Sequence, residues 1–99
     1  MAEAVKKPIL RSSDENLYEW EPGNGTRYLL ALARTGRGTI VSWLRYGDVG
    51  GSSFLIFEGA KSGMSIGYFM EKMSLKLEGD AVAILDFLVE MGEVESYDQ

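Results

Sequence analysis

The strongest constraint on the fold is a change of pattern near Asp80. Polar and apolar residues alternate through much of residues 64–76, which is the period of a β-strand. Over residues 81–91, nine of eleven residues are apolar and the alternation is lost. Asp80 can cap the first backbone N–H groups of a helix, and Gly92 can adopt the left-handed conformation that ends one. The pattern therefore predicts a strand that leads into a long C-terminal helix.

Three shorter strands are predicted before this stretch. Residues 27–34, 39–46 and 53–58 are rich in aliphatic, β-branched and aromatic side chains, and short glycine-containing loops separate them. Four strands with short connections usually form an antiparallel meander. The predicted fold class is therefore α+β, a four-stranded antiparallel β-meander followed by one long C-terminal helix (ββββα).

The 99 residues suffice for one domain with a single core. We predict an irregular N-terminal arm over residues 1–26, in which residues 17–20 could add a short edge strand. Residues 27–92 form the predicted sheet-plus-helix domain, and residues 93–99 an acidic C-terminal tail. Two roles stay open for the tail: a solvated end, or a segment that lies over the basic part of the sheet.

The composition excludes several classes of function. The chain has no cysteine and no histidine, which excludes thiol and imidazole catalysis and the usual zinc sites. Asp48, Glu58 and Glu71 are the acids of the predicted sheet, and their spacing does not force them together. We therefore predict a protein that is not an enzyme and uses neither metal nor cofactor. No apolar run reaches the ~18 residues of a membrane helix, so we expect an intracellular protein without a membrane partner.

Charge is distributed unevenly along the chain, although the net charge is −5. Residues 27–76 contain seven basic and three acidic residues, a balance of +4. Residues 77–99 contain seven acidic residues and no basic one. Such asymmetry bears on the partners of a protein rather than on its fold. It leaves room for an acidic partner at the predicted sheet.

Aromatic and basic side chains share faces of the predicted strands. Alternation places Tyr28 with Arg34 on one strand, and Trp43 with Arg45 on the next. Single-stranded DNA or RNA needs aromatic rings for its bases and cations for its phosphates. The predicted nucleic-acid-binding residues are Tyr28, Arg34, Arg37, Trp43, Arg45, Tyr68, Lys72 and Lys76. In the alternative interpretation, the aromatic side chains fill the core and the arginines are solvated.

The predicted helix is apolar almost all round, whereas a helix on one sheet needs only a ~100° apolar arc. A second neighbour is therefore expected, either the N-terminal arm or, as we predict, another subunit. The predicted oligomer interface consists of Val82, Leu85, Leu88 and Val89. The same observation supports an alternative function, a protein-interaction or structural assembly module that uses the apolar helix and the sheet edge without nucleic acid.

Two short motifs resemble a known family. Met73-Ser74-Leu75-Lys76 runs into the predicted helix at residues 81–91, and Arg27-Tyr28 begins a strand that ends at a glycine hairpin over residues 36–38. This arrangement resembles the positive-cofactor-four type of transcriptional coactivator and the Whirly proteins. The resemblance implies a sheet that binds single-stranded DNA or RNA, helices that mediate oligomerisation, and a role in transcription.

Overall fold

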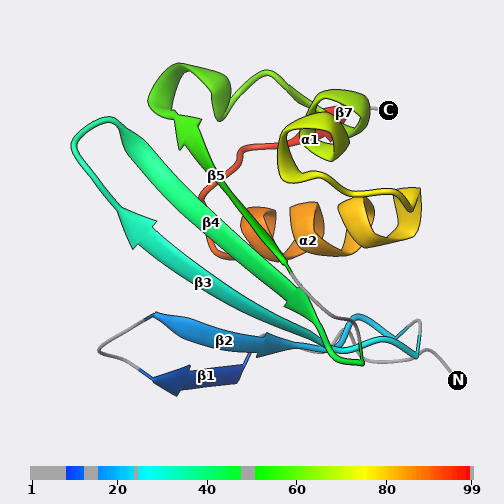
Figure 1. Ribbon diagram of the computed structural model, residues 1–99. Helices are drawn as coiled ribbons and strands as arrows, with labels where there is room; N and C mark the ends of the chain where they lie inside the picture. The colour runs from blue at the N-terminus through cyan, green and yellow to red at the C-terminus, as the bar shows by residue number, and fades with distance from the viewer. Residues whose placement is uncertain (1–8, 13–15, 24, 48–50, 99) are drawn as a thin grey trace, which may run out of the picture.

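The computed structural model describes residues 9–12, 16–23, 25–47 and 51–98 (Figure 1). Its elements in chain order are β1 (Ile9–Ser12), β2 (Leu17–Trp20), β3 (Tyr28–Arg34), β4 (Gly38–Arg45), β5 (Ser52–Phe57), a 3₁₀ turn η1 (Glu58–Ala60), β6 (Met64–Ser65), α1 (Ile66–Met73), α2 (Glu78–Glu90) and β7 (Tyr97–Asp98). No helix among these elements is both long and apolar enough to cross a membrane.

Strands β1 to β5 form one antiparallel sheet in chain order, with β1 and β5 at its edges. Its longest hairpin, β3–β4, pairs Tyr28 with Arg45 at one end and Arg34 with Thr39 at the other. The α+β class and an antiparallel meander are thus confirmed, although the described sheet has five strands where four were predicted. The strands predicted at residues 27–34, 39–46 and 53–58 correspond to β3, β4 and β5.

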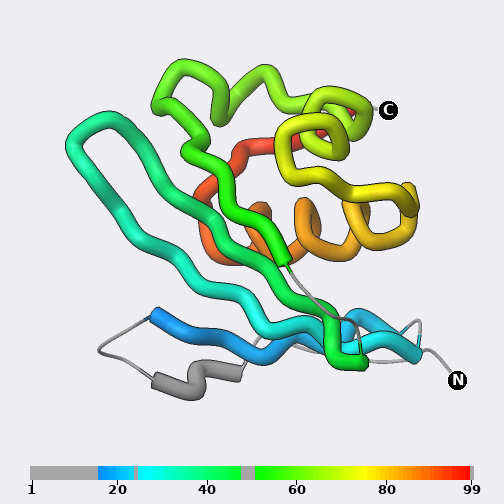
Figure 2. Tube along the Cα trace, viewed as in Figure 1, coloured from blue at the N-terminus to red at the C-terminus, as the bar shows by residue number. Residues whose placement is uncertain are grey.

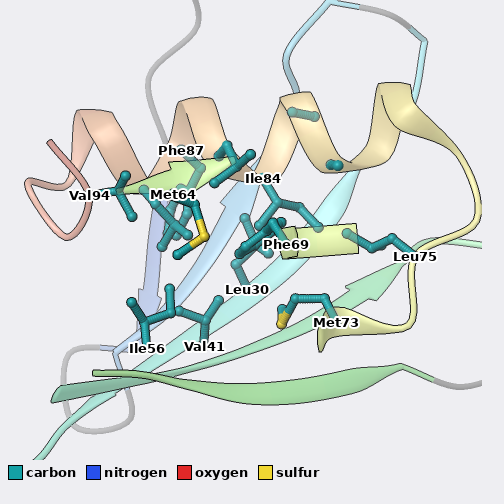
Figure 3. Packing of buried hydrophobic residues seen from close by; sticks show 14 of the residues in the cluster. Leu30, Val41, Ile56, Met64, Phe69, Met73, Leu75, Ile84, Phe87 and Val94 are labelled. Atoms are coloured by element: carbon teal, nitrogen blue, oxygen red, sulfur yellow. The ribbon is translucent and has the colours of Figure 1, made fainter. Parts of the chain in front are cut away.

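Both helices lie on one side of the sheet, so the fold has two layers (Figures 1 and 2). We call the side of the sheet beneath them the covered face. Side chains from the covered face, from the inner sides of α1 and α2 and from the connecting segments form one core (Figure 3). The largest fully buried side chains are those of Tyr28, Phe69, Phe87, Leu30, Leu32, Ile56, Met64, Met73, Ile84, Leu85, Leu88 and Val41.

The strand predicted over residues 64–76 is wrong, because only β6 is extended and α1 follows it at once. The Ser65 hydroxyl accepts a hydrogen bond from the backbone N–H of Tyr68 and caps the helix. The buried residues of α1 are Ile66, Phe69 and Met73, which have helical rather than strand spacing. Ser74, in the left-handed conformation, ends the helix.

The prediction of one long helix is therefore also wrong in detail, since two helices follow the sheet. The second neighbour expected for α2 belongs to the same chain. Helix α1 packs beside α2, and from β2 the Trp20 indole N–H donates to the Ala83 carbonyl at 3.0 Å. Tyr18 meets Phe87 edge to face at a centroid distance of 5.5 Å. The N-terminal arm and α1 together cover the apolar surface that had suggested another subunit.

Both predicted terminal segments contribute to the folded domain. Strand β2 lies inside the sheet between β1 and β3, where an irregular arm with an optional edge strand was predicted. In the predicted tail, Glu93 and Val94 are buried, and β7 pairs with β6 in parallel. This segment runs on the helical side of the sheet (Figure 1). The predictions for residues 1–8, 13–15, 24, 48–50, which include Asp48, and 99 lie outside the described residues.

Candidate interaction surface

Two of the predicted nucleic-acid contacts meet inside the protein, at a buried carboxylate of α2. The Tyr28 side chain is fully buried, and its hydroxyl donates to Asp80 Oδ1 at 2.6 Å. Arg45 Nη1 donates to the two oxygens of the same carboxylate at 3.2 and 3.1 Å. These bonds join the first turn of α2 to β3 and β4. A base cannot stack on Tyr28 while the helices stay in place.

Trp43 also serves the contact between the sheet and the helices. It is half-buried and packs against the core. Its indole N–H, which can only donate, bonds the Met73 carbonyl at the end of α1 at 3.0 Å. The covered face that carries Tyr28, Trp43 and Arg45 is thus the core side of the sheet. For Tyr28 and Trp43, the alternative interpretation from the sequence, in which aromatic side chains fill the core, describes the structure.

Arg34 belongs to a second internal cluster, built around Glu93. The side chain of Glu93 is 7% exposed, and Arg34 donates to its Oε2 from Nε at 2.8 Å and from Nη2 at 2.6 Å. Thr39 Oγ1 donates to Glu93 Oε1 at 2.6 Å, and Lys61 Nζ lies 3.3 Å from the same atom. We call Arg34, Thr39, Lys61 and Glu93 the Glu93 cluster. The Glu93 cluster connects the segment after α2 to the β3–β4 hairpin and to the turn after β5.

The Glu93 cluster changes the acidity of its carboxyl group. Burial by itself raises the pKa of Glu93. The hydrogen bonds from Thr39 and Arg34, the charge of Arg34 and the hydrogen bond from Lys61 outweigh burial and hold that pKa below 4.5. Glu93 is therefore held as a carboxylate with its oxygens occupied, which suits a structural ion cluster rather than a proton-transferring group.

Three further predicted contacts, Arg37, Tyr68 and Lys72, are exposed. Arg37 lies in the β3–β4 turn, where its backbone N–H donates to the Thr35 hydroxyl at 3.1 Å. On α1, Lys72 Nζ lies 5.7 Å from the centroid of the Tyr68 ring, a cation–π arrangement. Lys76, also exposed, follows α1 in the connection to α2. The structure thus pairs Tyr68 with Lys72 on α1, on the helical side of the sheet.

The predicted oligomer interface on α2 is largely internal. Leu85 and Leu88 have no exposed surface in the single chain, so their assignment to an interface is wrong. Val82 is half-buried and packs against the core. Val89 is 38% exposed. These residues fill the space between α2, the sheet and α1, and a subunit contact is not needed to explain their apolar character.

The other side of the sheet is apolar as well. We call it the outer face, and none of its residues belongs to the core. By strand register it comprises Leu17, Glu19, Leu29, Ala31, Ala33, Ile40, Ser42, Leu44, Ser53, Leu55 and Phe57. All of them are half-buried by their neighbours or exposed, and Phe57 is 52% exposed. None of the described helices crosses this face (Figure 1).

The outer face has a regular relief. Ala31, Ser42 and Ser53 lie side by side on β3, β4 and β5 and form a row of small residues, which we call the hollow. The rows on either side are bulky: Ile40 with Leu55 on one side, and Leu29 with Leu44 on the other. Because residues two apart on a strand are separated by about 7 Å, the three rows make a shallow groove between two ridges.

Charged groups on this side of the sheet lie together at the end next to Leu29 and Leu44. Tyr46 donates from its hydroxyl to Glu19 Oε2 at 2.8 Å. Arg27 stacks over the Tyr46 ring at 5.3 Å from its centroid. Glu19 and Arg27 have opposite charges, and both contact Tyr46. The hollow and the two ridges contain no charged residue.

One signal in the sequence could have revealed the outer face. Residues 28–33 are apolar without interruption, so both faces of that strand are apolar. A strand of this kind is typical of a sheet that is buried on both sides. The aromatic and basic residues that predicted a binding site indicate only one of the two faces of the sheet.

No protein-family model matches the chain, and the searches of curated proteins and of solved structures gave no match. Among the described residues, no group of three or more acidic side chains is placed to hold a metal ion. Among the described surfaces of this chain, the outer face is the most unusual, because it is apolar and no described helix covers it.

Proposed function

We propose that this protein is a non-enzymatic protein-interaction module whose outer face binds an apolar, uncharged face of another polypeptide. The observation that carries the proposal is an apolar sheet surface that no described helix covers. A half-solvated antiparallel sheet ordinarily has polar residues on its open side. Here that side has five large aliphatic residues and a phenylalanine.

The size of the outer face is typical of a functional patch. Strands β2 to β5 have 25 residues in all, and at about 4.8 Å between strands and about 3.3 Å per residue they cover about 400 Å². The largest apolar patch of a typical monomer is about 300–600 Å² and is often functional. Keeping such a surface in water is unfavourable, and binding another apolar surface recovers that free energy.

The chemistry of the outer face favours protein over nucleic acid. A single-stranded nucleic acid needs cations along its phosphates and free aromatic faces for its bases. The described outer-face residues of β2 to β5 include no cation, and Arg27, which lies beside them, already stacks over Tyr46. Apolar contact is the interaction that most of these residues offer.

Single-stranded DNA or RNA binding is the competing candidate function. One observation favours it: the exposed ring of Tyr68 lies beside the Lys72 ammonium on α1. A site of this size would hold one base and one phosphate, and its affinity would fall with salt. This candidate uses a surface different from the outer face, so the two functions can be tested separately.

Two titrations test the proposal. An environment-sensitive apolar dye should bind dilute wild-type protein, and Phe57→Lys on the outer face should weaken that binding. Leu77→Lys is the matched control, because Leu77 is 53% exposed, close to the 52% of Phe57, and lies in the connection between the helices. A labelled single-stranded oligonucleotide should not bind at low salt.

Saturable oligonucleotide binding that Tyr68→Ala or Lys72→Ala abolishes would favour the competing function. Equal dye binding by both lysine variants, or none by the wild type, would overturn the assignment of the outer face.

A further inference from the structure

We propose that the occupant of the outer face is a second copy of this chain, and that two copies pack sheet against sheet as a two-fold dimer. This inference rests on the proposed function, because it names the partner of the same surface. Two facing sheets would be about 10 Å apart, as in a β-sandwich. Each copy would keep its helices on the outside, so the dimer would have four layers.

The relief of the outer face is self-complementary. The hollow at Ala31, Ser42 and Ser53 is one row wide, and the ridge of Leu29 and Leu44 lies one row, about 7 Å, away. A two-fold axis across the strands, midway between these two rows, places the Leu29 and Leu44 ridge of each copy over the other copy's hollow. The same axis keeps β4 over β4 of the partner. Both copies then make the same contacts, as an isologous interface requires.

The charge distribution favours this approach over others. The exposed acids of the C-terminal region, Glu78, Asp86, Glu90, Glu95 and Asp98, belong to α2 and the segment after it, on the helical side of the sheet. Two copies that met through their helical sides would bring these like charges together. Sheet-to-sheet contact keeps them at opposite ends of the dimer, and the uncharged hollow meets the uncharged ridge of Leu29 and Leu44 without repulsion.

The area suits a modest dimer. Two outer faces have a combined flat footprint of about 800 Å², and side-chain relief increases the accessible area that is buried. Specific interfaces bury about 1,000 Å² or more, so this contact lies at the small end of that class. We therefore expect a dissociation constant in the micromolar range rather than a permanent dimer.

Solution mass is the first test. Light scattering from about 1 to 500 µM should show a shift from the monomer of 11.0 kDa toward twice that mass. Leu44→Lys, which puts a charge on the ridge at the centre of the interface, should weaken dimerisation at least tenfold. Leu77→Lys should leave it unchanged. Circular dichroism of both variants controls for loss of fold.

Cross-linking supplies the second test and does not depend on a destabilising change. The chain contains no cysteine, so Ser42→Cys places a single thiol in the hollow. With sheets about 10 Å apart and an offset of about 7 Å, this position lies roughly 12 Å from the partner's Ser42. A bismaleimide of matching span should join two Ser42→Cys chains. Ser62→Cys, exposed between η1 and β6, should stay monomeric under the same conditions.

The outcomes separate this inference from the proposed function. A dimer that Leu44→Lys weakens and Ser42→Cys captures supports the inference. A dimer that Leu44→Lys does not weaken and that Ser42→Cys does not capture overturns it, and so does a monomer at every concentration. If the monomer still binds the apolar dye at its outer face, the face serves a different polypeptide and the proposed function survives. If the monomer does not bind the dye, the chain covers its own face and both proposals fail.

Discussion

The buried carboxylate of Glu93 offers the sharpest test of what holds the fold together. We consider Glu93→Gln, which keeps the size of the side chain and removes its charge. Glutamine can still accept a hydrogen bond from the Thr39 hydroxyl through its amide oxygen. Its NH₂ group would face Arg34 or Lys61, and two donors cannot bond each other. The substitution therefore converts a satisfied ion cluster into one with opposed donors.

The expected loss in the free energy of unfolding depends on how exposed each partner of Glu93 is. Removing a hydrogen bond to a charged group costs about 1.5–3 kcal/mol when the site is buried. The Arg34 side chain is 51% exposed, so solvent limits the contribution of its pair to about 1 kcal/mol or less. Lys61, with its side chain 19% exposed, loses more and keeps Glu58 as its other partner at 3.2 Å. Together we expect a loss of about 2 kcal/mol in the free energy of unfolding, or about 10 °C in Tm.

The effect should depend on pH with a definite sign. The folded pKa of Glu93 is below 4.5, the value taken for the unfolded chain. Below about pH 4.5 the unfolded chain therefore binds more protons at this site than the folded chain, and stability falls with pH. The contribution of Glu93 is fully present near neutral pH and is lost as pH falls through the folded pKa. The stability gap between wild type and Glu93→Gln should narrow on acidification.

Urea unfolding followed by the fluorescence of Trp20 and Trp43 measures both quantities, at about pH 7 and about pH 3. The buried Trp20 and half-buried Trp43 both change environment on unfolding. Glu95→Gln is the matched control, since this side chain is exposed two residues further along the same segment. A Glu93→Gln variant within about 0.5 kcal/mol of wild type at neutral pH, or a gap that does not narrow in acid, would refute the argument.

Two other predictions concern the close approach of β4 to β5 and the C-terminus. A Cβ at Gly38 would collide with the Ile56 carbonyl oxygen, whereas one at Gly36 would meet no atom within 4 Å. Gly38→Ala should therefore cost about 2 kcal/mol or more in urea unfolding, and Gly36→Ala about 0.5 kcal/mol or less; equal effects would contradict this close approach. Burial, the hydrogen bond to Asp86 and the charge of Asp86 raise the pKa of Tyr97 to about 12. Between pH 10 and pH 12 the unfolded chain loses this proton first, so stability falls with rising pH. Tyrosinate absorbance, compared between wild type and Tyr97→Phe, should show this titration, and Asp86→Asn should lower its midpoint; an unchanged midpoint would count against the Asp86 contact.

The strand predictions succeeded where the local pattern permits one outcome. Strand β4 has β-branched and aromatic residues between glycine loops, and no helical spacing competes with its alternation. The stretch that became α1 was ambiguous, because Ile66, Phe69 and Met73 fit a helix while neighbouring residues alternate. The Ser65 cap favoured the helix, and its capping role was not considered.

The candidate site was harder to predict, because the sequence pattern of a sheet with two apolar faces does not indicate which face the helices cover. The basic middle of the chain and its acidic C-terminal part were attributed to an outside partner. In the structure they meet each other: Arg45 bonds Asp80, and Arg34 and Lys61 bond Glu93. Charge asymmetry along a sequence thus reflects internal pairing here.

Residue order alone determined the local elements of this protein: the three strands β3 to β5, the β3–β4 turn and an apolar C-terminal helix. It did so because strand and helix periods, caps and glycines act over a few neighbouring positions. Only the tertiary structure decided which face of the sheet the helices cover, and with it which aromatic side chains are buried and which apolar surface stays open. That choice depends on contacts between residues 35 to 63 positions apart, such as Arg45 with Asp80 and Trp20 with Ala83, and no local period encodes them.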